Sequence, residues 1–567
     1  MASSPAHRLD VVPAAWLMRY PKAWLGPDVA AGLTAATVVL PKALAYATVA
    51  GLPMQVGLYT CFVPMVVYAL LGTSRPLSVS STTTLAILSA AALGGVAPDG
   101  DAATLLAAGA TLACLVGVML LLAAALRLGF VANFISEPVL IGFKAGIGLV
   151  IIVDQLPKLL GFHIHKAGFL RDVGTIAQQV PQASLPTVAL AASVFLLILA
   201  LERFAHRVPA PLVAIAGAIA AASLLNLPAQ GVETVGRVPG GLPGWTWPQW
   251  QLVEALWPAA AGIALMSFTE SIAAARAFAT PGEPRLSPNR ELLALGLANV
   301  GGSVLGAMSA GGGTSQTAVN RRAGARTQLS QLVTSAVAVA TMLLLAPVIA
   351  LIPQAALAAI VVAYSVELIQ PREFIAIRRV RRVEFRWAVI AFVGVILLGT
   401  LKGIVIAMIA SLVSLAYQAY NPPVYALGRK RGTNVFRPLT PDHPEDETWP
   451  GLLMLRTEGR VFFANAQCIA DSVTEHIRRE RPRVVVFDCS ALTDIEYTAL
   501  KMLIAAEQSL RAAGITLWIA ALNLDARAVV QRSGLAASLG KERMFFNLES
   551  AVRGYQVLAA AEADRPS

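Results

Sequence analysis

Long runs of apolar residues follow one another along the first 420 residues of the chain, and short polar loops separate them. Each run is about 17–22 residues long, which is the length that a helix needs to cross the hydrocarbon core of a bilayer. The first run, near Val29–Val49, is too long for the apolar part of a cleaved signal peptide, so we expect it to remain in the membrane. The pattern predicts about fourteen membrane-spanning segments.

The pattern changes near residues 420–450, where proline and charged residues replace the long apolar runs. Beyond this point strand-like runs alternate with helical ones, which is typical of a small α/β domain. The predicted strands are Leu452–Arg456, Val461–Ala464, Val484–Asp488, Ile515–Ala520 and Met544–Asn547, and the predicted helices are Gln467–Arg479, Thr498–Ala512 and Ala526–Ser533. We therefore divide the chain into an N-terminal segment (residues 1–25), a polytopic all-α membrane domain (26–420), a linker (421–449) and a small α/β domain (450–560).

The composition agrees with a membrane protein. Hydrophobic residues make up 56% of the 567 residues and charged residues only 14%, and the mean hydropathy is +0.66. A soluble globular chain carries about 25% charged residues, so an ordinary soluble enzyme is excluded. The formal net charge of +11 is better explained by Lys and Arg in cytoplasmic loops than by nucleic-acid binding. The four cysteines include no C-x-x-C pair, and we expect no disulfide, metal or cofactor.

Basic residues in the loops predict the orientation, because Lys and Arg favour the cytoplasmic side. If Arg8, Arg19 and Lys22 are cytoplasmic, the loops on that side carry Arg75, Arg127, Arg203, Arg207, Arg276, Arg285, Arg290, Arg321, Arg322, Arg326, Arg378, Arg379, Arg381 and Arg382. The opposite loops carry Asp99, Asp101 and the long segment Leu227–Trp250, in which Arg237 is the only basic residue, although the loop near Lys158–Arg171 is an exception. We therefore expect a multi-pass protein of the cell (inner) membrane with both termini in the cytoplasm.

The spans divide at the long loop 227–250 into two halves of seven. Because each half has an odd number of spans, the second half starts on the opposite side of the membrane, so two similar halves would be inverted relative to each other. In such proteins the substrate binds near the midplane, where helices are broken at corresponding positions of the two halves. The third segment of the first half opens with a hydroxyl-rich stretch, 77–84, and that of the second half opens with a glycine-rich stretch, 309–317. An offset of about 228 residues relates the two breaks, and the same offset relates Lys42 to Glu270.

Lys42 and Glu270 are the ionisable residues deepest in the first span of each half. A charge in the middle of a span costs at least about 2.5–3.5 kcal/mol on insertion scales, so it needs a partner or a wet cavity. One interpretation is a structural ion pair that holds the halves together. In the other interpretation Lys42 binds an anionic substrate and Glu270 carries the coupled proton. Both interpretations can hold, each in a different transport state.

The two polar breaks suit the capture of an anion. The N-terminus of a half-helix presents unpaired N–H groups and roughly half a positive charge. Two such ends that face each other would form a site made mostly of backbone, with hydroxyl donors from Thr82, Thr83, Thr314 and Ser315. Gly311–Gly313 would let the backbone approach the ligand closely. The alternative is tight helix packing through small residues.

The chain resembles the SulP family, the solute-carrier-26 type of anion transporters, over nearly its whole length. The stretches that carry this resemblance are Gly26–Thr34, Ala45–Ala47, Ala50–Pro53, Gly57–Tyr59, Glu291-Leu292, Gly296–Asn299, Thr317–Asn320 and Gly324–Thr327. The resemblance implies seven-plus-seven inverted repeats, core and gate subdomains, a cytoplasmic STAS domain, homodimers and an anion site between the third and tenth spans. The candidate substrate-binding residues are Lys42, Tyr46, Thr82, Thr83, Gly313, Thr314, Ser315 and Gln316.

Two of these positions depart from the family pattern. Family members commonly have glutamine where this chain has Lys42, and many have arginine where it has Gln316. We interpret Lys42 as a replacement for the missing arginine, that is, as the fixed positive charge for the anion. For the coupling ion we expect H+ carried by Glu270, because a sodium site needs several oxygen ligands and Ala274, one turn on, offers none. Ser267 and Ser271 keep Na+ as an alternative.

In the C-terminal domain, the loop 488–498 resembles the signature loop of STAS domains. In bacterial anti-sigma antagonists a serine at the start of the following helix is phosphorylated. Tyr497 and Thr498 occupy this place here, so we do not expect a phosphorylation switch. We expect instead a docking and assembly module, and its partner would be a cytoplasmic protein. We find no sequence motif of an enzyme.

Taken together, the sequence favours a secondary active transporter of a small inorganic or carboxylate anion in the lipid bilayer. Sulfate is the first candidate, and bicarbonate or dicarboxylates such as succinate or fumarate remain open, because a backbone-lined site recognises charge and size more than identity. The alternatives are a passive anion channel, a nucleobase–cation permease of the same architecture, and a membrane-tethered signalling protein. The embedded carboxylate of Glu270 argues against a channel, and a neutral base would have no use for Lys42.

Overall fold

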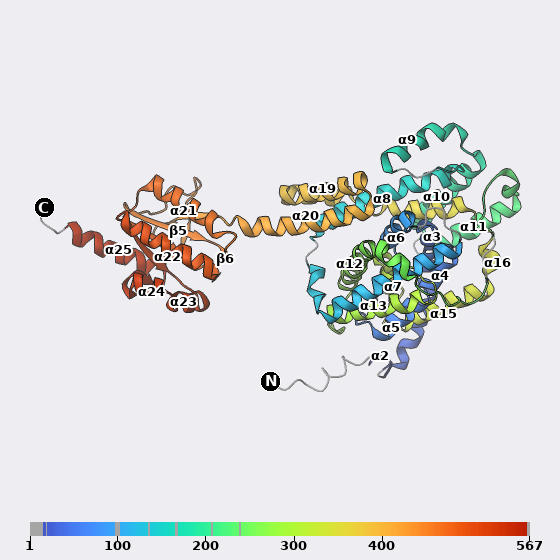
Figure 1. Ribbon diagram of the computed structural model, residues 1–567, viewed down its shortest axis with the longest axis horizontal. Helices are drawn as coiled ribbons and strands as arrows, with labels where there is room; N and C mark the ends of the chain where they lie inside the picture. Colours follow the sequence, from blue (N-terminus) through green and yellow to red (C-terminus); the bar gives the residue numbers. More distant parts are fainter. Residues whose placement is uncertain are drawn as a thin grey trace. The chain divides into compact units, whose positions relative to one another are not determined.

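The computed structural model describes residues 15–18, 20–96, 102–133, 136–164, 168–205, 208–236 and 240–563. Most of the predicted N-terminal segment therefore lies outside the described residues, as do Arg8, Arg19, Asp99, Asp101, Arg207 and Arg237. The chain divides into two compact units, Met1–Leu412 and Val413–Ser567. Each is described by itself (Figure 1).

The N-terminal unit is helical, and seven segments in each half correspond to the predicted spans. The first half contains α3 (Leu25–Val49), α4 (Gln55–Thr60) with α5 (Val63–Leu71), β1 (Val79–Ser80) with α6 (Thr83–Val96), α7 (Ala102–Ala125), α8 (Glu137–Leu160), α10 (Leu185–Phe204) and α11 (Ala210–Leu224). The second half, with its last helix running into the C-terminal unit, contains α12 (Val253–Ala277), α13 (Pro288–Ser303), β2 (Gly311–Gly312) with α14 (Thr314–Arg322), α15 (Leu329–Leu344), α17 (Gln354–Val366), α19 (Arg382–Leu398) and α20 (Thr400–Tyr420). Short helices in the loops include α9 (Phe169–Gln179) and α18 (Pro371–Val380).

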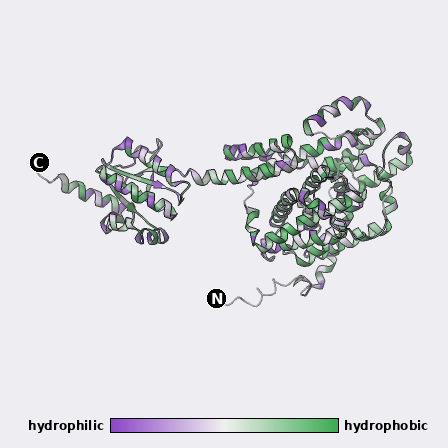
Figure 2. Ribbon diagram, in the orientation of Figure 1, coloured by the Kyte–Doolittle hydropathy of each residue, from purple (hydrophilic) through white to green (hydrophobic). Residues whose placement is uncertain are grey.

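Six helices in the described part of the chain are long and apolar enough to cross a membrane, and four shorter apolar helices accompany them. The shorter set includes α6, which is short because it begins only after the first break. Figure 2 shows apolar residues over most helices of the N-terminal unit and more hydrophilic residues in the C-terminal unit.

The packing of the helices repeats between the two halves. The helix α12 of the second half packs against α6 and α7 of the first half, and α3 of the first half packs against α14 and α15 of the second half in the equivalent way. These helices, together with α4, α5 and α13, form a group that we call the core bundle. The helices α8, α10, α11, α17 and α19 pack mainly against one another and form a second group, the gate bundle. The two bundles meet where α11 and α17 contact α3.

The C-terminal unit is built on a six-stranded mixed sheet with the strand order β10-β9-β7-β5-β3-β4. The strands are β3 (Val424–Arg429), β4 (Phe436–Pro438), β5 (Leu452–Thr457), β7 (Val484–Asp488), β9 (Thr516–Ala520) and β10 (Met544–Phe545), and β6 (Gly459–Val461) pairs separately with β8 (Leu492–Ile495). The helices are α21 (Ala466–Glu480), α22 (Tyr497–Ala512), α23 (Leu524–Gln531), α24 (Gly534–Leu539) and α25 (Leu548–Ala563). Apolar side chains on both faces of β5, β7 and β9 form its two hydrophobic clusters.

The structure differs from the sequence expectation at the predicted linker, 421–449. Strands β3 and β4 lie within it, and β3 pairs antiparallel with β5, so this segment contributes to the sheet. Its proline and charged residues concealed two short strands at the sheet edge, where proline is tolerated. Tyr497 is the first residue of α22 and is 72% exposed.

Candidate functional site

The two helix breaks predicted from the sequence meet inside the core bundle. Strands β1 and β2 pair antiparallel, with Val79 opposite Gly312 and Ser80 opposite Gly311. The Gly313 N–H also donates to the Ser78 carbonyl at 3.1 Å. Because α6 and α14 begin directly after the two strands, their N-terminal ends lie next to each other. This pairing satisfies backbone groups that two isolated breaks would leave unpaired in an apolar environment.

Side chains from α14 reinforce the pairing. The Gln316 carbonyl Oε1 accepts a hydrogen bond from Ser80 Oγ at 2.9 Å, and its Nε2 donates to the Ser81 carbonyl at 3.0 Å. Thr317 Oγ1 accepts from the Ser78 N–H at 3.1 Å. Gln316 therefore connects the two breaks. The sequence did not predict this structural role, because it placed Gln316 only at the edge of the anion site.

The core bundle also holds β2 from behind. The Gly312 N–H donates to Ser271 Oγ at 2.7 Å, and Ser267 Oγ donates to the Ala310 carbonyl at 2.7 Å. A Cβ atom at Gly312 would lie 2.9 Å from Cα of Ser271, so a larger residue here would push β2 away from α12. The close approach of strand and helix thus explains the glycine-rich sequence of this break. Ser267 and Ser271 therefore hold β2 in place through their hydrogen bonds.

A cavity of about 760 Å³ lies between the core and gate bundles, at the tips of α6 and α14. Eight of the nine candidate residues line it: Tyr46, Thr82, Thr83, Glu270, Gly313, Thr314, Ser315 and Gln316. Thr314 and Ser315 are exposed to it at the first turn of α14. Backbone N–H groups of a first helical turn have no intrahelical acceptor, so both helix ends offer hydrogen-bond donors to this space.

Lys42, the ninth candidate, lies behind the cavity wall and is only 2% exposed. Its Nζ atom is 3.4 Å from Ser315 Oγ and 3.4 Å from the centre of the Tyr364 ring. The carboxylates of Glu202 and Glu367 are close enough for their charges to act on it. The positive charge therefore stands directly behind the tip of α14, at the contact between α3 of the core bundle and α17 of the gate bundle.

Glu270 lies on the opposite side of the same site and is 7% exposed. Thr84 Oγ1 donates to its Oε1 at 2.8 Å, and Thr82 Oγ1 lies 3.3 Å from its Oε2. Among the described residues, then, Lys42 and Glu270 have separate partners and do not form the ion pair considered from the sequence. The pair of opposite charges flanks the two helix tips instead.

Sequence reasoning missed several residues of the cavity. Thr84 was in the hydroxyl-rich stretch, but only the fold shows that it faces Glu270. The gate bundle contributes Lys144, Tyr364 and Glu367, and α12 contributes Arg276 nearer the open end. The three residues of the gate bundle belong to segments that carry no repeat or motif signal, and they reach the site only through packing of the two bundles.

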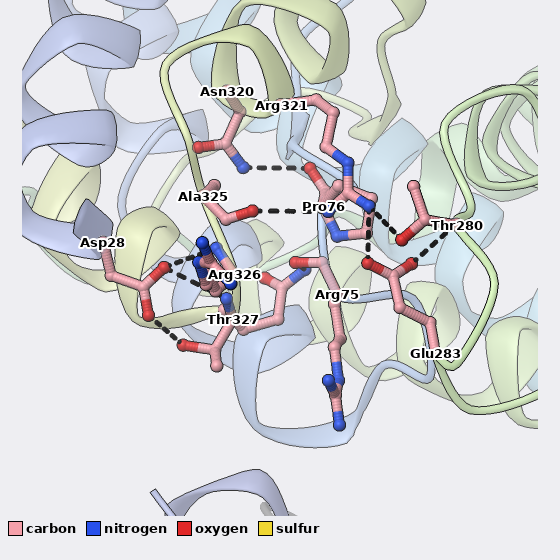
Figure 3. Close-up of polar contacts among 11 residues, drawn as sticks. Asp28, Arg75, Pro76, Thr280, Glu283, Asn320, Arg321, Ala325, Arg326 and Thr327 are labelled. Atoms are coloured by element: carbon pink, nitrogen blue, oxygen red, sulfur yellow. Dashed lines mark hydrogen bonds and ion pairs between the residues drawn. The ribbon is translucent and has the colours of Figure 1, made fainter. Parts of the chain in front are cut away.

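A second polar cluster fixes the far end of α14, and Figure 3 shows it. The buried carboxylate of Asp28, near the start of α3, accepts hydrogen bonds from the N–H of Arg326 at 2.6 Å and from Thr327 Oγ1 at 2.6 Å. Asn320 Nδ2 donates to the Pro76 carbonyl at 2.9 Å, just before the first break. The segments 26–34 and 324–327, which carry the family resemblance, are therefore in direct contact.

The comparisons with known proteins agree with this architecture. Residues 25–391 match the sulfate permease family, and residues 443–551 match the STAS domain. A probable sulfate transporter of Mycobacterium tuberculosis is 35% identical over 541 residues, which cover 95% of this chain and 96% of that protein. The chloroplastic sulfate transporter 4.1 of Arabidopsis thaliana is 30% identical over 547 residues, covering 93% of this chain and 79% of that protein.

Two solved structures share the fold. SLC26A9 superposes with a TM-score of 0.88 at 21% identity, covering 98% of this chain and 94% of that chain. The transmembrane domain of the cyanobacterial bicarbonate transporter BicA superposes with a TM-score of 0.59 at 24% identity, covering 69% of this chain and 98% of that chain. The match to BicA is thus confined to part of the chain.

A helical membrane domain with one broken helix in each half, followed by a STAS domain, defines a polytopic membrane transporter with the SLC26-type fold. The chain belongs to the sulfate permease family. The SulP resemblance and the predicted fold class are thereby confirmed. The family consists of transporters, in agreement with the expectation that the chain is not an enzyme.

Proposed function

We propose that this protein is a secondary active transporter that holds a small anion between the N-termini of α6 and α14 and is coupled to protons. The observation that carries the proposal is the meeting of these two helix tips at one cavity, with Lys42 Nζ 3.4 Å behind Ser315. Helix N-termini bind anions through unpaired N–H groups and the helix dipole. Sulfate is the first candidate, because relatives at 35% and 30% identity are described as sulfate transporters.

Lys42 and the two threonine- and serine-bearing helix tips would recognise the anion together. A mobile anion at the tip of α14 would accept hydrogen bonds from Thr314 and Ser315, and Lys42 would supply the fixed charge behind them. Tyr46, Thr83 and Gly313 line the same cavity and would surround the anion. Such a site measures charge and size, so bicarbonate and dicarboxylates remain candidate substrates.

Proton coupling rests on Glu270. Its carboxylate lies beside the same helix tips, and an ionised carboxylate there opposes a second negative charge by about 3 kcal/mol at a separation of about 6 Å and an effective dielectric constant of 20. Protonation of Glu270 would remove this repulsion, so anion and proton would load together. The two threonine hydroxyls that contact it are fewer oxygen ligands than a sodium ion requires, which makes Na+ the weaker alternative.

Alternating access would follow from movement of the core bundle against the gate bundle, which carries the site past the contact between α3 and α17. The cavity reaches the surface near Arg276, Gln370 and Glu373, next to loops that are rich in arginine. By the positive-inside rule this side is cytoplasmic, so the cavity would open inward. We further propose that both termini are cytoplasmic, that the protein resides in the cell (inner) membrane and that it assembles as a homodimer.

The test is uptake of labelled sulfate, bicarbonate, succinate and fumarate into proteoliposomes that contain the purified full-length chain. Uptake driven by an inwardly directed proton gradient, and unaffected by sodium, is expected. The double variant Thr314→Ala, Ser315→Ala should raise the KM at least tenfold, because hydrogen bonds to charged groups contribute about 1.5–3 kcal/mol each. Thr341→Ala on α15, whose hydroxyl bonds within its own helix, is the matched control.

Other outcomes would select other functions. Conductive flux without any gradient coupling would indicate an anion channel, and competition by uracil but not sulfate would indicate a nucleobase permease. Normal activity of the double variant would place the site elsewhere. Deletion of residues 424–567, which removes the whole sheet including β3 and β4, would separate permeation from a signalling or docking role of the STAS domain.

A further inference from the structure

The helix α18, between α17 and α19, is short and strongly basic. The segment 371–386 that contains it and the start of α19 carries six arginines and two glutamates. None of the ten residues of α18 is buried. Acidic partners within the segment are too few to neutralise it, since Glu384 lies 3.5 Å from Arg381 and Glu373 lines the cavity. A cluster of this charge needs an explanation beyond local ion pairs.

One face of α18 is anchored to the gate bundle. The Phe374 ring packs edge-to-face against Phe385 and Phe392 of α19, with ring centres 6.5 and 6.3 Å apart. The Arg378 guanidinium lies 6.0 Å from the centre of the Phe385 ring. The helix also contacts α8. Its position relative to the membrane helices is therefore fixed by packing.

The outward face mixes basic and apolar side chains. Arg372, Ile375 and Arg379 lie three and four residues apart, so they share one face of the helix. Ile375 is 51% exposed, and Val380 at the end of the helix is 81% exposed. Exposure of these apolar side chains to water is unfavourable. At a bilayer surface they can enter the boundary of the acyl chains, while the guanidinium groups remain among the headgroups.

We propose that α18 and the start of α19 form a binding surface for anionic phospholipid headgroups. Guanidinium groups match phosphate geometry with two parallel hydrogen bonds, and juxtamembrane basic clusters attract anionic lipids. The lipid phosphate, held next to the first turn of α19, satisfies the charge of the cluster, and the acyl chains cover Ile375 and Val380. Because Gln370 and Glu373 line the cavity, this lipid surface borders its open end.

The test uses the full-length protein in detergent and measures its Tm with added short-chain phosphatidylglycerol, phosphatidylethanolamine or inorganic phosphate. The wild type should gain Tm with phosphatidylglycerol and gain little with the other two. Replacing Arg372, Arg378, Arg379 and Arg382 by Gln should remove this difference, with affinity falling about fivefold for each arginine. The matched Lys variant should keep it, because the charge is retained.

A second set of four exposed arginines, Arg478, Arg481, Arg527 and Arg532 in the STAS domain, provides a control of equal charge change when replaced by Gln. This control should respond to phosphatidylglycerol like the wild type. An undiminished response in the α18 Gln variant would overturn the proposal, as would equal stabilisation by phosphatidylethanolamine. Equal stabilisation by inorganic phosphate would also overturn it, because the site would then bind a free anion. The Tm of the Gln variant without lipid shows whether the variant folds. If it folds poorly, the single variant Arg379→Gln serves as the test instead.

Discussion

Replacing Lys42 by Gln tests the role of the fixed positive charge most directly. Lys42 Nζ is 3.4 Å from Ser315 Oγ, and a hydroxyl donor holds an anion oxygen at about 2.7 Å, so the charge lies about 6 Å from the bound anion. At this separation and an effective dielectric constant of 20, the attraction is about 3 kcal/mol for each negative charge. We therefore expect kcat/KM for anion uptake to fall about a hundredfold or more, because each 1.4 kcal/mol is a factor of ten.

The assay is initial-rate uptake of labelled sulfate into proteoliposomes that contain equal amounts of folded protein. Lys42→Arg, which keeps the charge, is the control and should retain most of the activity. Adding Gln316→Arg to Lys42→Gln should restore uptake only in part, since the new guanidinium replaces the carboxamide that bonds Ser80 and Ser81. Wild-type rates in the Lys42→Gln single variant would refute the reasoning.

Three further results are expected. Glu270→Gln should abolish the dependence of uptake on the proton gradient while exchange of anion for anion persists; unchanged gradient dependence would assign the proton elsewhere. Gly142→Ala should sharply lower the amount of folded protein recovered, because its Cβ would overlap backbone of α19, whereas Gly174→Ala, with open space around it, should not. Burial raises the pKa of the Cys489 thiol, so it stays protonated and should resist maleimide at neutral pH until the domain unfolds; rapid labelling of Cys489 itself in the native protein, located by peptide mapping because Cys114 and Cys468 are less buried, would contradict this.

The sequence predicted the membrane fold well because its signal is a simple physical one. Apolar runs of membrane length, arginine-rich loops and two polar interruptions at a fixed offset are each visible without a structure. The strands β3 and β4 were not predicted, because six and three residues with proline nearby carry too little alternation to be recognised. Their place in the sheet depends on the long-range pairing with β5.

Only those parts of the candidate site that have a local sequence signal were predicted. The two breaks and the residues Lys42 and Glu270 stood out, since polar and charged groups are rare within spans. The bonds that Gln316 makes to the first break join residues more than two hundred positions apart, and no local pattern indicates them. Tyr364 was missed for the same reason, because its contact with Lys42 exists only once α17 lies against α3.

The pairing of β1 with β2 has a consequence for how the protein is made. Val79 and Gly312 are 233 positions apart (312 − 79), and a ribosome adds about 5–20 residues per second. The serine- and threonine-rich first break therefore waits in or near the translocation machinery for roughly ten to fifty seconds before its partner strand exists. During that interval water or the insertion apparatus must supply the hydrogen bonds that β2 provides in the finished protein, so the first break cannot settle in the hydrocarbon core before the second half of the chain is made.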